Sequence, residues 1–529
     1  MNLAENLIPR PQHLATSGSA AFTLHASARI AASGGALASA GQLAALLRRA
    51  TGYALPLVAE ALPGDLVLEF TDMPDGGPEA YAVSVTAESV RLTATDPAGL
   101  FNAVQTLRQL FPAAVEGAAE GTGGTEPAWT VPAVEIADTP RLPYRGLMLD
   151  VARSFFTVAE VKQQIDTMSQ FKLNALHLHL TDDQAWRIEI HNPAENPSGL
   201  DYSRLTSVGG QGAVDHPGVG LTPGHTGFYT QQDFREIVDY AATRNVLIVP
   251  EIDLPGHVNA ALAALPQLNP DGRPRPMNTS GEVGYSTLDA ANPLTYEFVR
   301  EVLGQLAAIT PGPYLHIGGD EALVTGHDNY VAMVREFAAI AAGLGKTVVG
   351  WNEYADVELP QGAVVQYWHG ELAPAVRQAA ENGARILMSP AANTYLDQKY
   401  DSASPIGLEW VEGGPFTWAE YYAWDPAQGG IGEEQLLGVE GPLWTETVRG
   451  NRQAAWLTYP RAISLAEVGW SRQEDRELQD FRRRLGTFGE RLARQGVTFQ
   501  EAPDVDWSAA PAPAFSDEPV PAEPQVRNN

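Results

Sequence analysis

Residues 175 to 180 read Ala-Leu-His-Leu-His-Leu, and this stretch decides the fold class. Its leucines alternate with polar side chains, a period of two that is typical of a β-strand. A helix is predicted just before it, because Thr157 and Glu160 can form a capping box ahead of a one-sided apolar stripe, Val161, Ile165 and Met168. A helix that leads into a buried strand indicates the βα units of a parallel sheet.

Seven further apolar runs of this kind lie between residues 146 and 439, separated by helical patterns. They are Gly146–Asp150, Val246–Glu251, Tyr314–Gly318, Thr347–Trp351, Ala363–Trp368, Ala384–Met388 and Leu436–Val439, the weakest of the set. Eight βα units predict an α/β fold, a (β/α)₈ barrel whose catalytic groups lie at the carboxyl ends of the strands.

The chain of 529 residues is longer than one hydrophobic core usually organises. We predict three parts: an α+β accessory domain over residues 1–140, the catalytic barrel over 141–500, and an extended tail rich in Pro, Ala and Glu over 501–529. Residues 113–130 are rich in Gly, Ala and Glu and show no apolar period, so a flexible loop is expected there.

Composition excludes several function classes. The formal charge of −30, from 34 Lys and Arg against 64 Asp and Glu, would repel a nucleic acid backbone. No run of 18 apolar residues predicts a membrane span, and the absence of cysteine excludes disulfides and a thiol nucleophile. The first residues do not resemble a signal peptide, so a cytoplasmic location is expected, or secretion if a signal has been trimmed.

The segment His316-Ile-Gly-Gly-Asp-Glu321 ends the fourth predicted strand with two adjacent carboxylates. Neighbouring carboxylates raise each other's pKa, so one can stay protonated while the other is ionised, as glycoside hydrolysis requires. The glycines would let the backbone approach a ligand closely. The alternative is that Asp320 and Glu321 only begin a helix, where acids are favoured by the helix dipole.

Histidines mark the ends of the second and third predicted strands. His177 and His179 should point to the same side of their strand, as metal ligands or as core histidines hydrogen-bonded to carboxylates. His257 could bridge Asp182 and Glu321 and position the acid, or it could be a capping or loop residue.

Aromatic and acidic residues recur at the later strand ends. Indole rings stack on the apolar faces of sugars, and carboxylates accept hydrogen bonds from sugar hydroxyls. Three tryptophans beside carboxylates therefore favour a sugar site over a purely structural role; these residues are Trp351, Trp368, Trp444, Asp397 and Glu446.

Residues 141 to about 490 resemble the family 20 glycoside hydrolases, the β-N-acetylhexosaminidases, and the amino-terminal part resembles their accessory domain. The motifs occur in the family's order: Tyr144–Asp150 with Arg153, Asp182-Asp183, Pro-Gly-His257, His316–Glu321, Trp351-Asn-Glu353, Tyr395-Leu-Asp397 and Trp444-Thr-Glu446.

The resemblance implies a retaining, exo-acting enzyme that releases terminal N-acetylglucosamine or N-acetylgalactosamine from a glycan or chito-oligosaccharide without a cofactor or metal. Glu321 would be the acid and base, backed by Asp182 and His257, and Asp320 would hold the substrate's acetamido group as it attacks the anomeric carbon. Tyr395 would donate a hydrogen bond to the acetamido oxygen, and Trp351, Trp368 and Trp444 would enclose this group. Arg145, Asp397, Glu446 and Trp410 would complete the sugar site.

Two other functions remain open from the residues themselves. A metal-dependent barrel hydrolase could use His177, His179 and Asp182, and a non-catalytic carbohydrate-binding protein would keep the tryptophans without needing the Asp-Glu pair. The sequence decides neither the preferred sugar nor the oligomeric state.

Overall fold

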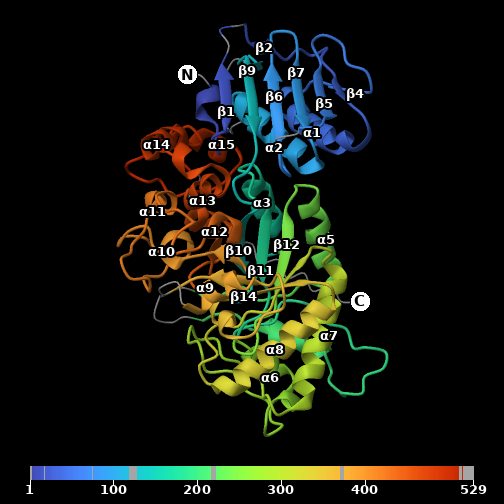
Figure 1. Cartoon of the computed structure of the whole chain (residues 1–529), viewed down its shortest axis with the longest axis vertical. Coiled ribbons are helices and arrows are strands. Elements are labelled where there is room, and N and C mark those ends of the chain that lie inside the picture. The colour runs from blue at the N-terminus through green and yellow to red at the C-terminus, as the bar shows by residue number, and fades with distance from the viewer. Residues whose placement is uncertain are drawn as a thin grey trace.

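The computed structural model describes residues 3–16, 18, 20–73, 76–117, 128–215, 222–369, 374–511 and 515. It consists of a closed barrel and a smaller sheet domain at the amino end of the barrel strands (Figure 1). Among the described residues, no helix is long and apolar enough to cross a membrane.

Eight parallel strands close the barrel in chain order, which confirms the predicted (β/α)₈ architecture. They are β10 (Tyr144–Asp150), β11 (Ala175–His179), β12 (Leu247–Glu251), β13 (Tyr314–His316), β14 (Thr347–Trp351), β15 (Val364–Tyr367), β16 (Arg385–Met388) and β17 (Leu436–Leu443).

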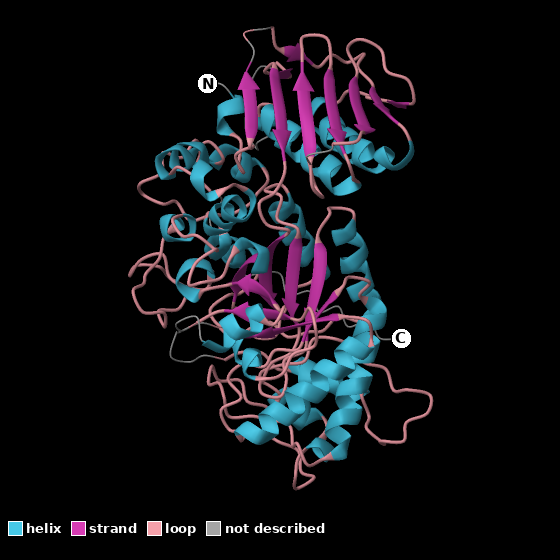
Figure 2. Ribbon diagram, viewed as in Figure 1, coloured by secondary structure: helices cyan, strands magenta, loops and turns pink. Residues whose placement is uncertain are grey.

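Helices surround the barrel (Figure 2), and in the chain they lie mainly between successive barrel strands. The predicted capping box of Thr157 and Glu160 begins α3. The helices of this domain are α3 (Val158–Ser169), α4 (Ser203–Ser207), α5 (Gln231–Ala242), α6 (Asn259–Ala264), α7 (Pro293–Ile309), α8 (His327–Gly343), α9 (Pro374–Glu381), α10 (Ala391–Thr394), α11 (Trp418–Tyr422), α12 (Asn451–Thr458), α13 (Arg461–Trp470), α14 (Leu478–Gly486) and α15 (Gly489–Arg494).

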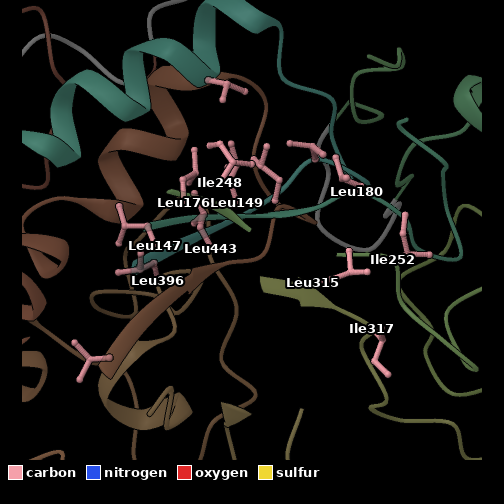
Figure 3. Close-up of a cluster of buried hydrophobic side chains, with 14 of the residues drawn as sticks. Leu147, Leu149, Leu176, Leu180, Ile248, Ile252, Leu315, Ile317, Leu396 and Leu443 are labelled. Carbon is pink, nitrogen blue, oxygen red and sulfur yellow. The ribbon is translucent and has the colours of Figure 1, made fainter. Parts of the chain in front are cut away.

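Alternation along the strands separates the hydrophobic core from the site. Leu176 and Leu178 belong to the apolar core between strands and helices, part of which is shown in Figure 3. His177 and His179 alternate with them on the same strand and contact carboxylates of other barrel strands. One side of β11 is thus apolar, and the other is polar where it faces the inside of the barrel.

The smaller domain is a seven-stranded sheet of order β1-β9-β6-β7-β5-β3-β4. Its strands are β1 (His13–Thr16), β3 (Ile30–Ala32), β4 (Leu57–Val58), β5 (Leu66–Phe70), β6 (Tyr81–Val85), β7 (Val90–Ala94) and β9 (Val134–Asp138), with a separate pair β2 (Phe22–Thr23) and β8 (Thr130–Val131). Two helices, α1 (Leu37–Thr51) and α2 (Pro97–Leu110), bury apolar faces in the same core as this sheet, which confirms the α+β prediction.

Two predicted irregular segments are shorter than expected. Within the expected loop at 113–130, Ala113–Glu116 forms a 3₁₀ helix with Val115 buried, and Trp129 is buried next to β8. Residues 118–127 lie outside the described residues. The predicted start of the tail, residue 501, is too early in the chain, because Ala502 and Val505 are buried. Residues 512–514 and 516–529 lie outside the described part.

A buried polar network joins the two domains. Asp138, at the end of β9, accepts hydrogen bonds from Tyr81 Oη at 2.6 Å and from Trp470 Nε1 of the barrel domain at 3.0 Å. The ammonium of Lys172 lies 4.8 Å from the Trp470 ring centroid. A cavity of about 1020 Å³ lies nearby, lined by α1, α2 and α3, and it is at the amino end of the barrel rather than the catalytic end.

Candidate active site

A tight turn after β13 presents the two adjacent acids. Gly318 and Gly319 have φ angles of 68° and 106°, and a Cβ added to Gly318 would lie 1.8 Å from Asp253 Oδ1. Only glycine fits there, so the sequence Gly-Gly is a requirement of the turn. Glu321 itself has a φ of 44°, a strained backbone conformation of the kind found at functional sites.

This turn gives the two acids different surroundings. Asp320 is 6% exposed, whereas the side chain of Glu321 is 31% exposed. Helix α8 begins only at His327, so the acids do not form the first turn of a helix. The alternative interpretation of the motif as a helix start is therefore wrong.

Asp182, His257 and Glu321 form the line of groups that the sequence predicted. Asp182 Oδ1 lies 3.2 Å from His257 Nδ1, and His257 Nε2 lies 3.6 Å from Glu321 Oε2. Burial alone would lower the pKa of His257, but Asp182 and Asp253 raise it well above its usual value. The structure thus places the imidazole directly behind Glu321, and the raised pKa favours its protonated form.

Asp320 lies at the centre of the site. Its Oδ2 lies 3.8 Å from His257 Nε2, and its Oδ1 is buried without a hydrogen-bond partner among the described residues. Burial raises the pKa of Asp320 to about 7; His257 opposes this shift, and Glu353, Glu251 and Glu321 add to it. Asp320 can therefore change protonation state near neutral pH.

Four aromatic rings form the wall beside the acids. Trp351 and Trp444 have ring centroids 6.0 Å apart, and Tyr395 lies 6.4 Å from Trp444 and stacks on Trp368 at 6.1 Å. Burial, followed by the nearby charge of Asp320, raises the pKa of Tyr395 well above its usual value. Tyr395 therefore keeps its proton and can donate a hydrogen bond close to Asp320.

Asp397, Glu446 and Trp410 lie on the same side of the site. Trp410 is 47% exposed, and its Nε1 donates to Asp397 Oδ2 at 3.1 Å. Asp397 Oδ1 and Glu446 Oε2 are buried acceptors without hydrogen-bond partners in the part of the chain that the structure describes. Burial and the neighbouring Glu446 raise the pKa of Asp397 to about 7. These oxygens are suited to accept bonds from ligand hydroxyls.

Arg145 is the one predicted site residue that the structure places elsewhere. It is the second residue of β10, at the amino end of the barrel, and its Nη2 donates to Glu79 of the smaller domain at 2.5 Å. Its Nε and Nη1 donate to the carbonyls of Lys172 and Leu142. The prediction that Arg145 binds substrate is wrong, because Arg145 lies at the amino end of β10 and the site lies at the carboxyl end.

The arginine of the site is Arg153, which lies just beyond the carboxyl end of β10. Its Nη2 contacts Asp182 Oδ2 at 2.8 Å, and its guanidinium carbon lies 5.0 Å from the Trp444 ring centroid. Burial would raise the pKa of Asp182, but Arg153 and His257 hold it well below its usual range. Arg153 stands three residues after Asp150, past the end of the strand, and this position in the sequence was the signal that it belongs to the site.

His177 and His179 are core histidines with carboxylate partners. His179 Nε2 lies 2.8 Å from Asp182 Oδ2, and His179 Nδ1 is hydrogen-bonded to Glu251. His177 Nδ1 lies 3.0 Å from Glu440. Four groups of described residues have donor atoms close enough for a metal, but none combines His177, His179 and Asp182. The predicted ligand set is therefore not brought together.

Sequence comparisons identify the family. The description "Glycosyl hydrolase family 20, catalytic domain" applies to residues 142–331 and 324–473, and "Glycosyl hydrolase family 20, domain 2" to residues 4–139. A β-N-acetylhexosaminidase of Cellulomonas fimi is 40% identical over 520 residues, which is 96% of this chain and 99% of that protein.

Solved structures agree with this result. A mutant β-hexosaminidase of Streptomyces plicatus in complex with its product GlcNAc has 40% identity and a TM-score of 0.87, covering 96% of this chain and 98% of that one. A family 20 β-N-acetylhexosaminidase of Streptomyces coelicolor A3(2) has 41% identity and a TM-score of 0.87, covering 96% and 99%. The chain belongs to glycoside hydrolase family 20 and is one of its β-N-acetylhexosaminidases.

Proposed function

We propose that the enzyme releases terminal N-acetylglucosamine or N-acetylgalactosamine, with retention of the β configuration, by using the substrate's own acetamido group as the nucleophile. The observation that supports this most directly is the division between the two adjacent acids. Asp320 is buried among aromatic rings with one unpartnered oxygen, whereas Glu321 is partly exposed. One acid is placed to hold a ligand group, and the other can reach a leaving group and water.

In the first step, Glu321 gives its proton to the glycosidic oxygen as the bond from that oxygen to the anomeric carbon breaks. The acetamido carbonyl oxygen attacks the same carbon, and an oxazolinium ion forms. Asp320 accepts a hydrogen bond from the acetamido N–H, and its carboxylate stabilises the developing cation. Tyr395 donates its hydroxyl hydrogen to the acetamido oxygen and orients it for attack.

In the second step, Glu321 acts as a base. It takes a proton from a water molecule, which attacks the anomeric carbon and opens the oxazolinium ring. Two displacements at one carbon leave the released sugar with its original β configuration. His257, held by Asp182, keeps the carboxyl group of Glu321 in place through both steps.

The natural substrate in this proposal is a glycan or chito-oligosaccharide with such a sugar at its non-reducing end. The complex of the Streptomyces plicatus enzyme with GlcNAc supports this choice. The unpartnered oxygens of Asp397 and Glu446 would accept bonds from the terminal sugar's hydroxyls, which explains exo action.

Chromogenic substrates test the mechanism directly. We expect turnover of the β-N-acetylglucosaminide and the β-N-acetylgalactosaminide, strong inhibition by a thiazoline mimic of the oxazoline, and almost no cleavage of the matching β-glucoside, which lacks the acetamido group. Rapid cleavage of the β-glucoside, or indifference to the thiazoline, would show that the acetamido group is not the nucleophile.

A further inference from the structure

Glu251, the last residue of β12, has a carboxylate that is fully buried inside the barrel. Its Oε2 is hydrogen-bonded to His179 Nδ1 and lies 3.1 Å from His177 Nε2. Its Oε1 accepts a hydrogen bond from Trp351 Nε1 at 2.9 Å and lies 3.0 Å from His316 Nδ1. One carboxylate is therefore shared among residues of three other barrel strands.

The first oxygen leads to the acid. From Glu251 the contacts run through His179 to Asp182 at 2.8 Å, from Asp182 to His257 at 3.2 Å, and from His257 to Glu321 at 3.6 Å. Carboxylates and imidazoles alternate along this line, so each imidazole that holds two protons has an acceptor on either side. Glu251 and Glu321 are thus the two ends of this line of contacts.

The second oxygen leads to the aromatic wall. Trp351 donates its indole N–H to Glu251, and its ring lies 6.0 Å from that of Trp444. This bond fixes the rotation of the indole, because the ring has no other polar atom to satisfy. The acid and the wall are thus attached to the same carboxylate.

The residues around Glu251 indicate that its carboxylate does more than occupy space inside the barrel. A cluster of buried residues nearer the amino end of the barrel is apolar except for the hydroxyl of Tyr144, which donates to Glu440. Its members are Tyr144, Ala175, Val249, Val349, Val364, Leu387 and Leu437. His177, Glu251 and Glu440 stand further along these strands, toward the carboxyl end and the site, and contact one another there. Burying a carboxylate is costly unless it is paired, and the fold alone accepts apolar residues inside the barrel.

We propose that Glu251 is a positioning residue that couples the acid to the wall: its charge keeps His179 protonated and the line to Glu321 aligned, while its other oxygen orients Trp351. This proposal rests on the role proposed above for Glu321. The pKa directions agree with it. Burial opposes both charges, yet the pKa of Glu251 is held well below its usual value by His316, His179 and His177, and that of His179 is raised well above its own by Glu251 and Asp182.

The test is the variant Glu251→Gln. Its amide oxygen can still accept from Trp351, but its NH₂ group faces His179 Nδ1, which must then accept a bond and lose its proton. The variant removes the negative charge of Glu251 and, with it, the positive charge of His179, which is nearer to Glu321 along the line of contacts. Loss of the nearer cation favours the protonated acid, so the alkaline limb of the kcat/KM profile should move to higher pH, by up to about one unit. We also expect kcat to fall by roughly tenfold, while inhibition by GlcNAc changes little because the bond to Trp351 remains.

Glu440→Gln is the matched control. Glu440 is equally buried and contacts His177 at 3.0 Å and Gln366 at 2.7 Å, on the side of His177 away from Glu251. It should shift the pH profile less, because no direct contact links it to Asp182 or Trp351. Equal shifts in the two variants, or an unchanged profile in folded Glu251→Gln, would overturn the coupling. The proposed function would stand in either case, provided that the thiazoline still inhibits.

A measurement on the parent enzyme covers the case in which Glu251→Gln does not fold. With ¹⁵N-labelled histidine, the rings of His179 and His257 should both carry two N–H protons at pH 7.5. A neutral His179 at that pH would contradict the proposal.

The other charged or titratable groups that face this line, and that affect its proton affinity, are Arg153, His177, His316, Asp183, Asp253 and Asp320.

Discussion

Two clusters of buried charged side chains, one at each end of the barrel, differ in how their polar atoms are paired. At the amino end, Arg145 donates to Glu79 and to backbone carbonyls, and Asp138 accepts from Tyr81 and Trp470. At the carboxyl end, buried oxygen atoms without hydrogen-bond partners among the described residues occur on Asp320, Asp397 and Glu446.

This difference separates stability from function. A buried polar group without a partner costs about 1–3 kcal/mol, so proteins retain few of them. The satisfied network at the amino end holds the two domains together, whereas the unsatisfied oxygens at the carboxyl end are suited to a ligand. Substitutions at the amino end should mainly change folding, and those at the carboxyl end should mainly change turnover.

The largest expected effect is that of Glu321→Gln on turnover. Loss of the acid and base should lower kcat by about 10²–10⁴-fold. The midpoint of thermal unfolding should stay close to that of the parent, because the side chain is partly exposed. Turnover and inhibition by GlcNAc, measured on the same preparation, check both points. A variant that hydrolyses at the parent rate would remove Glu321 from its proposed role.

Arg145→Met and Arg153→Met test the comparison most directly, since both change a buried arginine close to the same strand. Breaking the pair of Arg145 with Glu79 should lower the free energy of unfolding by about 3 kcal/mol and leave kcat/KM per folded molecule nearly unchanged. Arg153→Met should lower kcat/KM by at least about tenfold, because Asp182 loses the cation that keeps it ionised. Urea unfolding and steady-state kinetics measure the two effects, and the opposite distribution would contradict the comparison.

The effect of Asp320→Asn on stability depends on pH. The pKa of Asp320 is raised from 3.8 to about 7, so between these values the folded protein holds a proton that the unfolded chain has released. The stability of the parent therefore falls as pH rises through this window. Asparagine cannot ionise, so the variant should exceed the parent in stability by on the order of 4 kcal/mol at pH 8, and by much less at pH 4. Equal differences at the two pH values would rule out this explanation.

Much of the barrel could be predicted because its signal is local. Short apolar runs separated by helical patterns located all eight strands, and the residues after the strand ends located most of the site. Arg145 was misplaced although its position held the answer: it stands at the start of β10, whereas Arg153 follows the end of that strand. Motif resemblance drew attention to the wrong member of the pair.

Contacts between distant strands could not be predicted in the same way. The bond from Trp351 to Glu251 depends on the register of strands that lie 100 residues apart in the chain. The buried residues Val115 and Val505 stand in segments dominated by small and polar residues, so a few isolated apolar side chains gave no periodic signal. Their burial depends on neighbouring surfaces that the sequence does not identify.

The turn at Gly318 limits how this enzyme can be altered. Any larger residue there would meet the carboxylate of Asp253, so a library that randomises position 318 alone should return only glycine. A smaller residue at 253 would not make room, because the added Cβ would also lie 2.8 Å from the backbone Cα of residue 253. Efforts to obtain new sugar preferences should therefore vary the neighbourhood of Trp410, whose ring is nearly half exposed.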